Sequence, residues 1–246
     1  MKLRDELNNR EGYQEIIEFY TSSINEYEQE IELLLEYEKK GIQKYSNPNL
    51  EIIKSTKEEL RNAYYKILKS MYSKGDTIEG ILAIYLKLIS YFTETWKKSN
   101  GYVQMLEMLS IGIMLKIGDK DFKLLIEAVK KDDPQDLLID TLISYRDENW
   151  KQLSGKLMWN KPYKALQEVI FLAKEDKNLS LERLHKYLKK EWFRGAVEIQ
   201  THKSKFNIHS GYWSFESGAL VKILELDDAT LKDQQYYPYD MVHYKE

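Results

Sequence analysis

The chain has 246 residues, 40 acidic and 37 basic side chains, and a formal net charge of −3. It contains no cysteine, which excludes disulfide bonds, thiolate catalysis and cysteine-ligated zinc. Glycine and proline are scarce, at 11 and four residues, and 43% of the residues are hydrophobic. This composition excludes a disordered chain and predicts a folded, largely helical protein with a substantial core.

No segment has the composition expected of a membrane or export signal. The first residues, MKLRD, lead directly into polar sequence and lack the apolar region of a secretory signal. The most apolar window, residues 102–117, contains Glu107 and Lys116 and is shorter than the roughly 20 residues of a membrane span. We therefore expect a core helix at 102–117 and a cytoplasmic protein.

A long amphipathic helix is predicted from Gly12 to Lys40, closed by Gly41. Its apolar residues alternate at spacings of four and three, which places them on one face of a helix. They are Tyr13, Ile17, Tyr20, Ile24, Tyr27, Ile31 and Leu34.

The other positions of this helix carry charges of one sign. Nine glutamates and no lysine or arginine lie between Glu11 and Glu38, and because the whole chain carries −3, removing these nine charges leaves +6 for the remainder. The face is either merely solvated or built to attract a cationic partner. The second interpretation explains why the chain tolerates like charges four residues apart, which repel by a few tenths of a kcal/mol (about 0.2–0.5) per pair. The candidate partner-binding residues are Glu15, Glu18, Glu26, Glu32 and Glu36.

Eight further helices are predicted from apolar spacing and from cap and break signals. They cover residues 49–73, 76–96, 102–117, 122–129, 134–145, 162–173, 180–190 and 213–226. Asp76 with Glu79 has the form of a capping box, and Asn100-Gly101 is expected to break the chain between two helices. Alternating strand patterns are absent from the sequence, so the predicted fold class is all-α.

A boundary between two domains is predicted at residues 130–133. This segment is charged and ends in Asp133-Pro134, a cap followed by proline at the first helical position. We expect an acidic helical domain at 1–130 and a compact helical domain at 131–246. The second includes a polar connection at 147–161.

One residue of the predicted 213–226 helix departs from its apolar pattern. Glu216 precedes Ala219, Leu220 and Ile223 by three, four and seven positions, and so lies on the inward stripe. Its carboxylate either stays wet in the first turn, where the helix dipole favours an acid, or is buried beside a cation. Breaking a buried pair of that kind would cost ~3–5 kcal/mol. The candidate cations are Arg194, His202, Lys203 and His209.

Two other kinds of site have weaker support. His202 and His209, with Glu216 or Asp240, have side chains that can ligate a metal. Residues 203–209 lack the helical pattern that would place the two histidines on one face. The favoured interpretation is that these histidines are structural and form hydrogen bonds. A basic group could contact nucleic acid through neighbouring aromatic residues, although the net negative charge favours internal pairing with acids such as Glu191 and Glu198. The basic residues are Lys186, Lys189, Lys190, Arg194, Lys203 and Lys205.

Short motifs concentrate towards the C-terminus: WFRG at 192–195, THK at 201–203, GYWSFE at 211–216, DD at 227–228 and YYPYD at 236–240. Together they resemble the C-terminal domain of PoNi-type immunity proteins. RD at 4–5, the helix after Gly12 and YSKG at 72–75 are similar to that family's N-terminal domain, so the resemblance spans nearly the whole chain. The motif residues are Trp213, Glu216, Asp227, Asp228, Tyr236, Tyr237, Pro238 and Asp240. The tyrosines of YYPYD suit either a tail packed on the core or an interface anchor.

One departure from the family pattern follows Glu216. The sequence has Ser217-Gly218-Ala219 where alanines are expected. Glycine in a helix interior costs roughly 1 kcal/mol relative to alanine, so Gly218 predicts either a less rigid helix or close approach of another backbone.

The resemblance implies an antidote that binds and neutralises a cognate PoNe-type DNase toxin. It implies no catalysis and no cofactor. The net charge of −3 favours no direct nucleic-acid contact, and the short, charged apolar window at 102–117 favours no membrane span. A DNase needs a cationic cleft for phosphates, so an acidic helix is a suitable contact surface. The alternatives are a non-catalytic helical scaffold for a different protein partner and an enzyme using Glu216 with His202 or His209.

Overall fold

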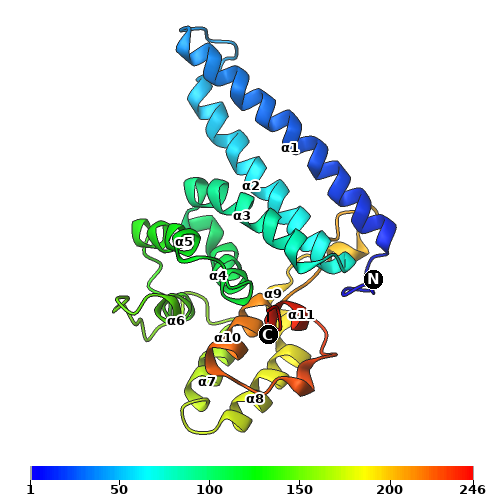
Figure 1. Ribbon diagram of the computed structural model, residues 1–246, viewed down its shortest axis with the longest axis vertical. Coiled ribbons are helices and arrows are strands. Elements are labelled where there is room, and N and C mark those ends of the chain that lie inside the picture. Colours follow the sequence, from blue (N-terminus) through cyan, green and yellow to red (C-terminus); the bar gives the residue numbers. More distant parts are fainter. Residues whose placement is uncertain (1, 246) are drawn as a thin grey trace. The chain divides into compact units, whose positions relative to one another are not determined.

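The computed structural model describes residues 2–245, which contain helices, turns and loops and no β-strand (Figure 1). The all-α prediction is confirmed. The helices are α1 (Arg10–Lys39), α2 (Asn49–Lys74), α3 (Ile78–Thr95), α4 (Lys98–Met114), α5 (Asp119–Lys131), α6 (Leu137–Arg146), α7 (Lys164–Leu172), α8 (Lys177–Lys186), α9 (Trp192–Ala196), α10 (Phe215–Leu224) and α11 (Tyr239–Val242). Three short segments are helical in other ways: η1 (Tyr187–Glu191) is a π-helix, and η2 (Thr201–Lys203) and η3 (Ala229–Leu231) are 3₁₀-helices.

The chain packs into two compact units. Unit 1 comprises the chain up to Thr95 together with Thr201–Gly211, and unit 2 comprises Trp96–Gln200 together with the chain from Tyr212. The packing division therefore places α4 and α5 with the C-terminal helices. The predicted sequence boundary at residues 130/131 is a different division and stays a prediction. Among residues 2–245, no helix has both the length and the apolar character needed to cross a bilayer.

Unit 1 is built on the pairing of α1 with α2, and α2 in turn packs against α3 (Figure 1). Asn9 caps α1, because its Oδ1 accepts a hydrogen bond from the Gly12 amide at 2.7 Å. The helix ends at Lys39, and Gly41 follows with φ +68°, as predicted. Tyr13 and Leu34 are fully buried, whereas Ile17 is only half-buried. Ile16, which the predicted pattern omitted, is buried instead.

The predicted capping box at the start of α3 is wrong. The Asp76 amide donates to the Met71 carbonyl at 3.0 Å and so belongs to the C-terminal turn of α2, after Gly75 at φ +92°. The Asp76 carboxylate pairs with Lys74 at 3.1 Å. The first turn of α3 is capped by Thr77, whose hydroxyl accepts from the Gly80 amide at 3.3 Å.

The predicted break at Asn100-Gly101 is also wrong, because both residues lie within α4. The chain leaves helical geometry earlier, at Trp96 and Lys97. Gly101 is needed for a contact: the Trp96 indole donates to its carbonyl at 2.9 Å, and a Cβ added at Gly101 would lie 2.7 Å from the indole ring. The glycine that indicated a turn in the sequence therefore makes room for the Trp96 ring within a helix.

The predicted cap at Asp133 is wrong as well, because the residue that caps α6 is Asp136. Gln135 has φ +50°, so the chain turns between Pro134 and the helix, and α6 begins three residues later than expected. Asp136 is the actual cap, and its Oδ1 accepts from the amides of Leu138 at 2.9 Å and Ile139 at 3.1 Å. Its other oxygen accepts from the Met158 amide at 2.7 Å, which ties the long connection to α6.

In unit 2, α10 packs against α4, α6, α7 and α11. A Cβ added at Gly218 would lie 2.6 Å from Met114 Sδ, 2.8 Å from Pro238 Cγ and 2.9 Å from Val242 Cγ2. The glycine therefore admits three side chains close to α10, whereas the sequence predicted the close approach of another backbone. Pro238 directly precedes α11 as its N-cap residue.

Candidate partner-binding surface

The acidic residues of α1 separate into two sets by their position around the helix. At about 100° per residue, six of them fall within an arc of roughly 120°. All six are exposed, and they lie opposite the buried residues Tyr13, Ile16, Ile24 and Leu34. We call this set the acidic face: Glu11, Glu15, Glu18, Glu26, Glu32 and Glu36. It contains all five residues that the sequence named as candidate contacts.

The other three glutamates hold α1 against its neighbours in unit 1. Glu28 Oε1 accepts from the hydroxyls of Tyr64 at 3.3 Å and Tyr91 at 3.2 Å. Glu30 accepts from Thr56 at 3.3 Å, and Glu38 accepts from the Asn49 amide group at 3.1 Å. Burial and the charge of Glu28 raise the pKa of both Tyr64 and Tyr91, so these hydroxyls stay protonated donors. These three glutamates therefore stabilise the packing of α1 against α2 and α3, and the other six are free to form the exposed acidic face.

The charge of the acidic face is only partly neutralised by neighbouring side chains. Glu36 forms an ion pair with Lys40, which lowers the pKa of the Glu36 carboxyl. Glu15 accepts from Asn207 at 2.9 Å, and Glu18 from Gln14 at 2.9 Å, both of which are neutral groups. Within residues 2–245, Glu26 and Glu32 have no hydrogen bond or ion pair. The middle of the helix therefore presents two uncompensated carboxylates to solvent.

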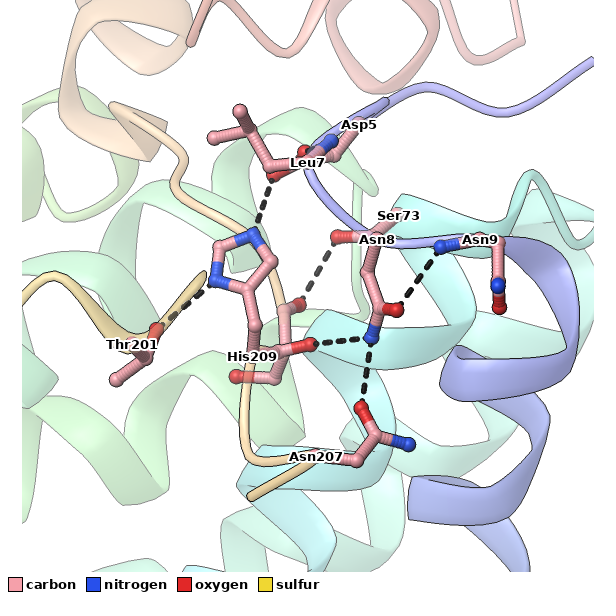
Figure 2. A network of polar contacts seen from close by, with 9 residues as sticks. Asp5, Leu7, Asn8, Asn9, Ser73, Thr201, Asn207 and His209 are labelled. Carbon is pink, nitrogen blue, oxygen red and sulfur yellow. Dashed lines mark hydrogen bonds and ion pairs between the residues drawn. The ribbon is translucent and has the colours of Figure 1, made fainter. Parts of the chain in front are cut away.

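The segment Thr201–Gly211 lies against the start of α1 and is fixed there by a network of polar contacts (Figure 2). His209 is 3% exposed, and its ring bridges Asp5 at 3.2 Å and the Thr201 hydroxyl at 2.9 Å. The Asn8 side-chain amide donates to Asn207 at 2.9 Å, and the Ser73 hydroxyl donates to the Ser210 carbonyl at 2.9 Å. Residues from the two ends of the chain thus form one part of unit 1.

This network explains motifs that the sequence left without a role. RD at 4–5 and YSKG at 72–75 meet here: the Arg4 guanidinium donates to the carbonyls of Tyr72 at 3.0 Å and Asp76 at 2.9 Å. His209 is placed by hydrogen bonds, as the favoured interpretation of the histidines predicted. The ring of His202 lies 5.8 Å from that of His209, and burial and the neighbouring His209 lower the pKa of His202.

A cavity of about 350 Å³ opens between the start of α1 and the segment 201–209. Two residues of the acidic face line it, Glu11 and Glu15, together with His202 and Phe206. The Phe206 ring is 66% exposed, and Phe19, one turn beyond Glu15 on α1, is also 66% exposed. Aromatic rings beside carboxylates give the surface of unit 1 the composition of an interaction site.

Glu216, by contrast, is a core residue of unit 2. It is 3% exposed, so the interpretation that it stays wet is wrong. Its Oε1 accepts from the Ser214 hydroxyl at 2.8 Å, the Trp192 indole at 2.9 Å and the Tyr187 hydroxyl at 3.3 Å. The expected cation partner is wrong too, because these three donors are neutral. Burial raises the pKa of Glu216, and these hydrogen bonds oppose the shift.

The remaining C-terminal motif residues lie in the segments that precede and follow α10, and most of them form hydrogen bonds or ring contacts there. Asp228 is 5% exposed and accepts from the Tyr237 hydroxyl at 2.5 Å and from His243 at 3.0 Å. Asp227 Oδ1 accepts a hydrogen bond at 3.2 Å from the amide of Ala229, the first residue of η3. Tyr236 stacks on Phe193, with 5.2 Å between ring centroids. Further motif residues differ in exposure: Trp213 and Pro238 are buried, and Asp240 is exposed.

Within the described part of the chain, residues 2–245, the six basic residues named from the sequence form no ion pair with Glu191 or Glu198. Glu191 pairs with Arg183 at 3.0 Å rather than with one of the named cations, and Arg183 also holds Glu168 at 2.5 Å. Lys203 and Lys205 belong to unit 1, whereas Lys186, Lys189, Lys190 and Arg194 belong to unit 2. The group is therefore divided between the two units.

Comparisons with known proteins identify the family. Residues 4–127 match the model of the PoNe immunity protein (PoNi) N-terminal domain, and residues 134–241 match the model of the PoNe immunity proteins (PoNi) C-terminal domain. No curated protein matches the chain.

Among solved structures, the crystal structure of protein PA2201 from Pseudomonas aeruginosa has a similar fold, with a TM-score of 0.64. The two sequences are 16% identical, and the match covers 99% of this chain and 98% of that one. Two adjacent family models thus account for nearly all of the sequence, and the chain belongs to the PoNi family of PoNe immunity proteins.

Proposed function

We propose that this protein neutralises a PoNe-type DNase toxin by binding it directly through the acidic face of α1. Family membership implies the immunity role against PoNe toxins. The single observation that supports this binding mode is the set of six exposed carboxylates on one face of a 30-residue helix. Helices that are merely solvated usually mix the two signs of charge, because mixed pairs stabilise and like pairs repel.

Electrostatics favours this surface as the contact. A DNase binds its substrate through cations that neutralise phosphates, so its cleft attracts a row of carboxylates. The attraction acts over a screening length of about 8 Å at physiological ionic strength and raises association rates. An acidic helix seated on such a cleft would also keep DNA out. Binding and inhibition therefore follow from the same charges.

Exposed aromatic rings next to the acidic face can supply the apolar contact area that carboxylates lack. Phe19 is adjacent to Glu15 on α1, and Phe206 lines the cavity beside the same glutamate. Buried aromatic residues surrounded by polar contacts are the usual centres of binding energy in protein interfaces. We therefore place the energetic centre of the contact near Glu15 and the steering charges along the rest of α1.

The test compares two triple charge reversals in the full chain. E18K/E26K/E32K changes the acidic face, and E148K/E175K/E182K makes the same change in net charge at exposed positions of unit 2. We expect the first to raise the dissociation constant for the purified toxin by about tenfold or more and to flatten its salt dependence. The second should leave both within about twofold, as is usual for exposed charges outside an interface.

Circular dichroism and urea denaturation of both variants establish that they are folded. Equal weakening by the two triple variants would show that net charge matters and the acidic face does not. Unchanged binding by a folded E18K/E26K/E32K would contradict the proposal.

A further inference from the structure

Unit 2 contains a cleft of about 420 Å³ whose charge is opposite to that of the acidic face. Four exposed cations line it, and among residues 2–245 none of them has an ion pair. These are Lys161, Lys164, Lys190 and Arg194. We propose that this cleft is a second docking site, which binds an acidic segment of a protein partner.

The packing of the WFRG motif shapes this cleft. A Cβ added at Gly195 would lie 2.6 Å from Pro162 Cβ, so only glycine permits this contact between α9 and the connection before α7. Trp192 points into the core, where its indole donates to Glu216 at 2.9 Å. Arg194 is exposed and lines the cleft. Within the motif, Trp192 therefore anchors α9 to the core, and Arg194 places its guanidinium at the cleft.

The two carboxylates of the cleft are already engaged. Arg183 contacts Glu191 through two parallel hydrogen bonds, at 3.1 and 3.0 Å, and Glu168 through its Nε at 2.5 Å. The lining includes five basic and two acidic side chains, which leaves a local charge of +3. Because Arg183 satisfies both acids, the charge of the other four cations faces an incoming ligand.

The chemistry of the lining favours a peptide over nucleic acid. The lining has no aromatic side chain on which a base could stack, and the Glu168 and Glu191 carboxylates would repel a phosphate backbone. Pro162 and Ala165 provide an apolar wall next to the cations. A guanidinium with neighbouring ammonium groups matches the geometry of a carboxylate, and the wall suits an apolar side chain beside it. An acidic peptide with interspersed apolar residues fits both features.

The experiment uses the full chain and fluorescent probes of defined chemistry. The probes are a peptide of alternating glutamate and leucine, the same peptide with glutamine in place of glutamate, and an oligothymidine of matching length. K190E/R194E reverses two cations of the cleft. K120E/K123E makes the same charge change at exposed lysines on α5, which also lies in unit 2.

We expect the acidic peptide to bind the wild-type chain and its dissociation constant to rise about tenfold or more in K190E/R194E, while K120E/K123E stays within about twofold. The glutamine peptide should bind far more weakly. Failure of the acidic peptide to bind would overturn the proposal, as would equal binding of the glutamine peptide. Oligothymidine that binds more tightly than the peptide and is lost in K190E/R194E would make the cleft a nucleic-acid site instead. None of these outcomes depends on the acidic face of α1.

Discussion

At the scale of single residues, Glu216 shows how one buried carboxylate can organise its surroundings. Its Oε1 accepts from Tyr187 and Trp192, which lie in the continuous helical run from α8 to α9, and from Ser214, which directly precedes α10. Removing the acceptor leaves three buried donors to find other partners, and each unsatisfied donor costs about 1–3 kcal/mol. The carboxylate therefore serves the fold of unit 2 and needs no catalytic explanation.

We expect Glu216→Ala to lower the free energy of unfolding by ~3–5 kcal/mol, from the lost acceptor together with the cavity left behind. Urea denaturation measures the change. Glu182→Ala, an exposed acid on α8, should change stability by less than about 0.5 kcal/mol. A loss below about 1 kcal/mol in Glu216→Ala would show that the three donors are satisfied without it.

The same residue predicts a pH dependence. Burial raises the pKa of Glu216, and burial together with the charge of Glu216 raises the pKa of Glu107. For an acid whose pKa is higher in the folded state, the folded protein binds more protons than the unfolded chain between the two pKa values. Stability from such a group therefore falls as the pH rises from the unfolded value near 4.5 through the folded value.

Glu216→Gln removes this ionisation while keeping an oxygen acceptor. The stability of the wild type relative to Glu216→Gln should be greatest at low pH and fall as the pH rises towards neutrality. Urea denaturation at several pH values measures the difference, with Glu182→Gln as the exposed control. A wild-type advantage that grows with pH would mean that the carboxylate is stabilised in its ionised form.

At the scale of elements, α10 depends on the absence of a side chain at Gly218. Alanine would gain about 1 kcal/mol in helix propensity, but its Cβ would overlap Met114, Pro238 and Val242. Overpacking of this kind typically costs about 1–3 kcal/mol, so we expect the steric effect to dominate and Gly218→Ala to be destabilising.

The matched control is Gly80→Ala in α3, where the added Cβ would lie 3.3 Å from Thr77 Oγ1 and 3.4 Å from Met71 Cε, farther than any of the three contacts at Gly218. This substitution should be neutral or stabilising by up to about 1 kcal/mol. Denaturation of the two variants side by side separates packing from propensity. The interpretation fails if both glycines respond alike.

In α1, the like charges that we propose favour toxin binding also lower the free energy of unfolding. Glu28 and Glu36 lie four residues on either side of Glu32, so Glu32→Lys replaces two repulsive pairs by two attractive ones. Each repulsion removed and each attraction gained contributes about 0.2–0.5 kcal/mol, so the variant should be more stable than the wild type by about 0.8–2 kcal/mol. Its affinity for the toxin should nevertheless decrease, because it loses an uncompensated charge of the acidic face.

Thermal denaturation and toxin binding on the same preparation measure both effects. Glu182→Lys provides the charge-matched control on α8. A Glu32→Lys protein that is more stable and binds as well as the wild type would mean that the repulsion in α1 has no function in this contact.

The sequence predicted best those elements whose signals are local. The alternation of apolar residues located α1, and the single sign of its charges located the acidic face. It failed where a local signal was used for tertiary packing: Gly101 accommodates the Trp96 ring within α4, and Asp136 rather than Asp133 caps α6. The candidate contacts named from the sequence already left out Glu28, Glu30 and Glu38, but the hydroxyls and the amide group that hold these three come from α2 and α3, and the sequence could not reveal those contacts.

At the scale of the whole molecule, a segment late in the chain packs with the N-terminal helices. The segment Thr201–Gly211 belongs to unit 1 although nearly all of its sequence neighbours belong to unit 2. Contacts such as Asp5 with His209 join residues about two hundred positions apart, and no periodicity or spacing in one sequence reveals them. Asp5, Ser73 and Thr201 lie in motifs that the sequence marked, but only the structure shows that they belong to one network of polar contacts.

The most direct test of the account measures whether this protein protects plasmid DNA from its cognate PoNe toxin. A fixed amount of active toxin is mixed with increasing amounts of the wild-type chain, and plasmid degradation is followed over time. We predict complete protection near one molar equivalent, with E148K/E175K/E182K equally protective and E18K/E26K/E32K requiring a large excess. Plasmid degraded at the same rate with excess folded wild-type protein as without it would contradict the account.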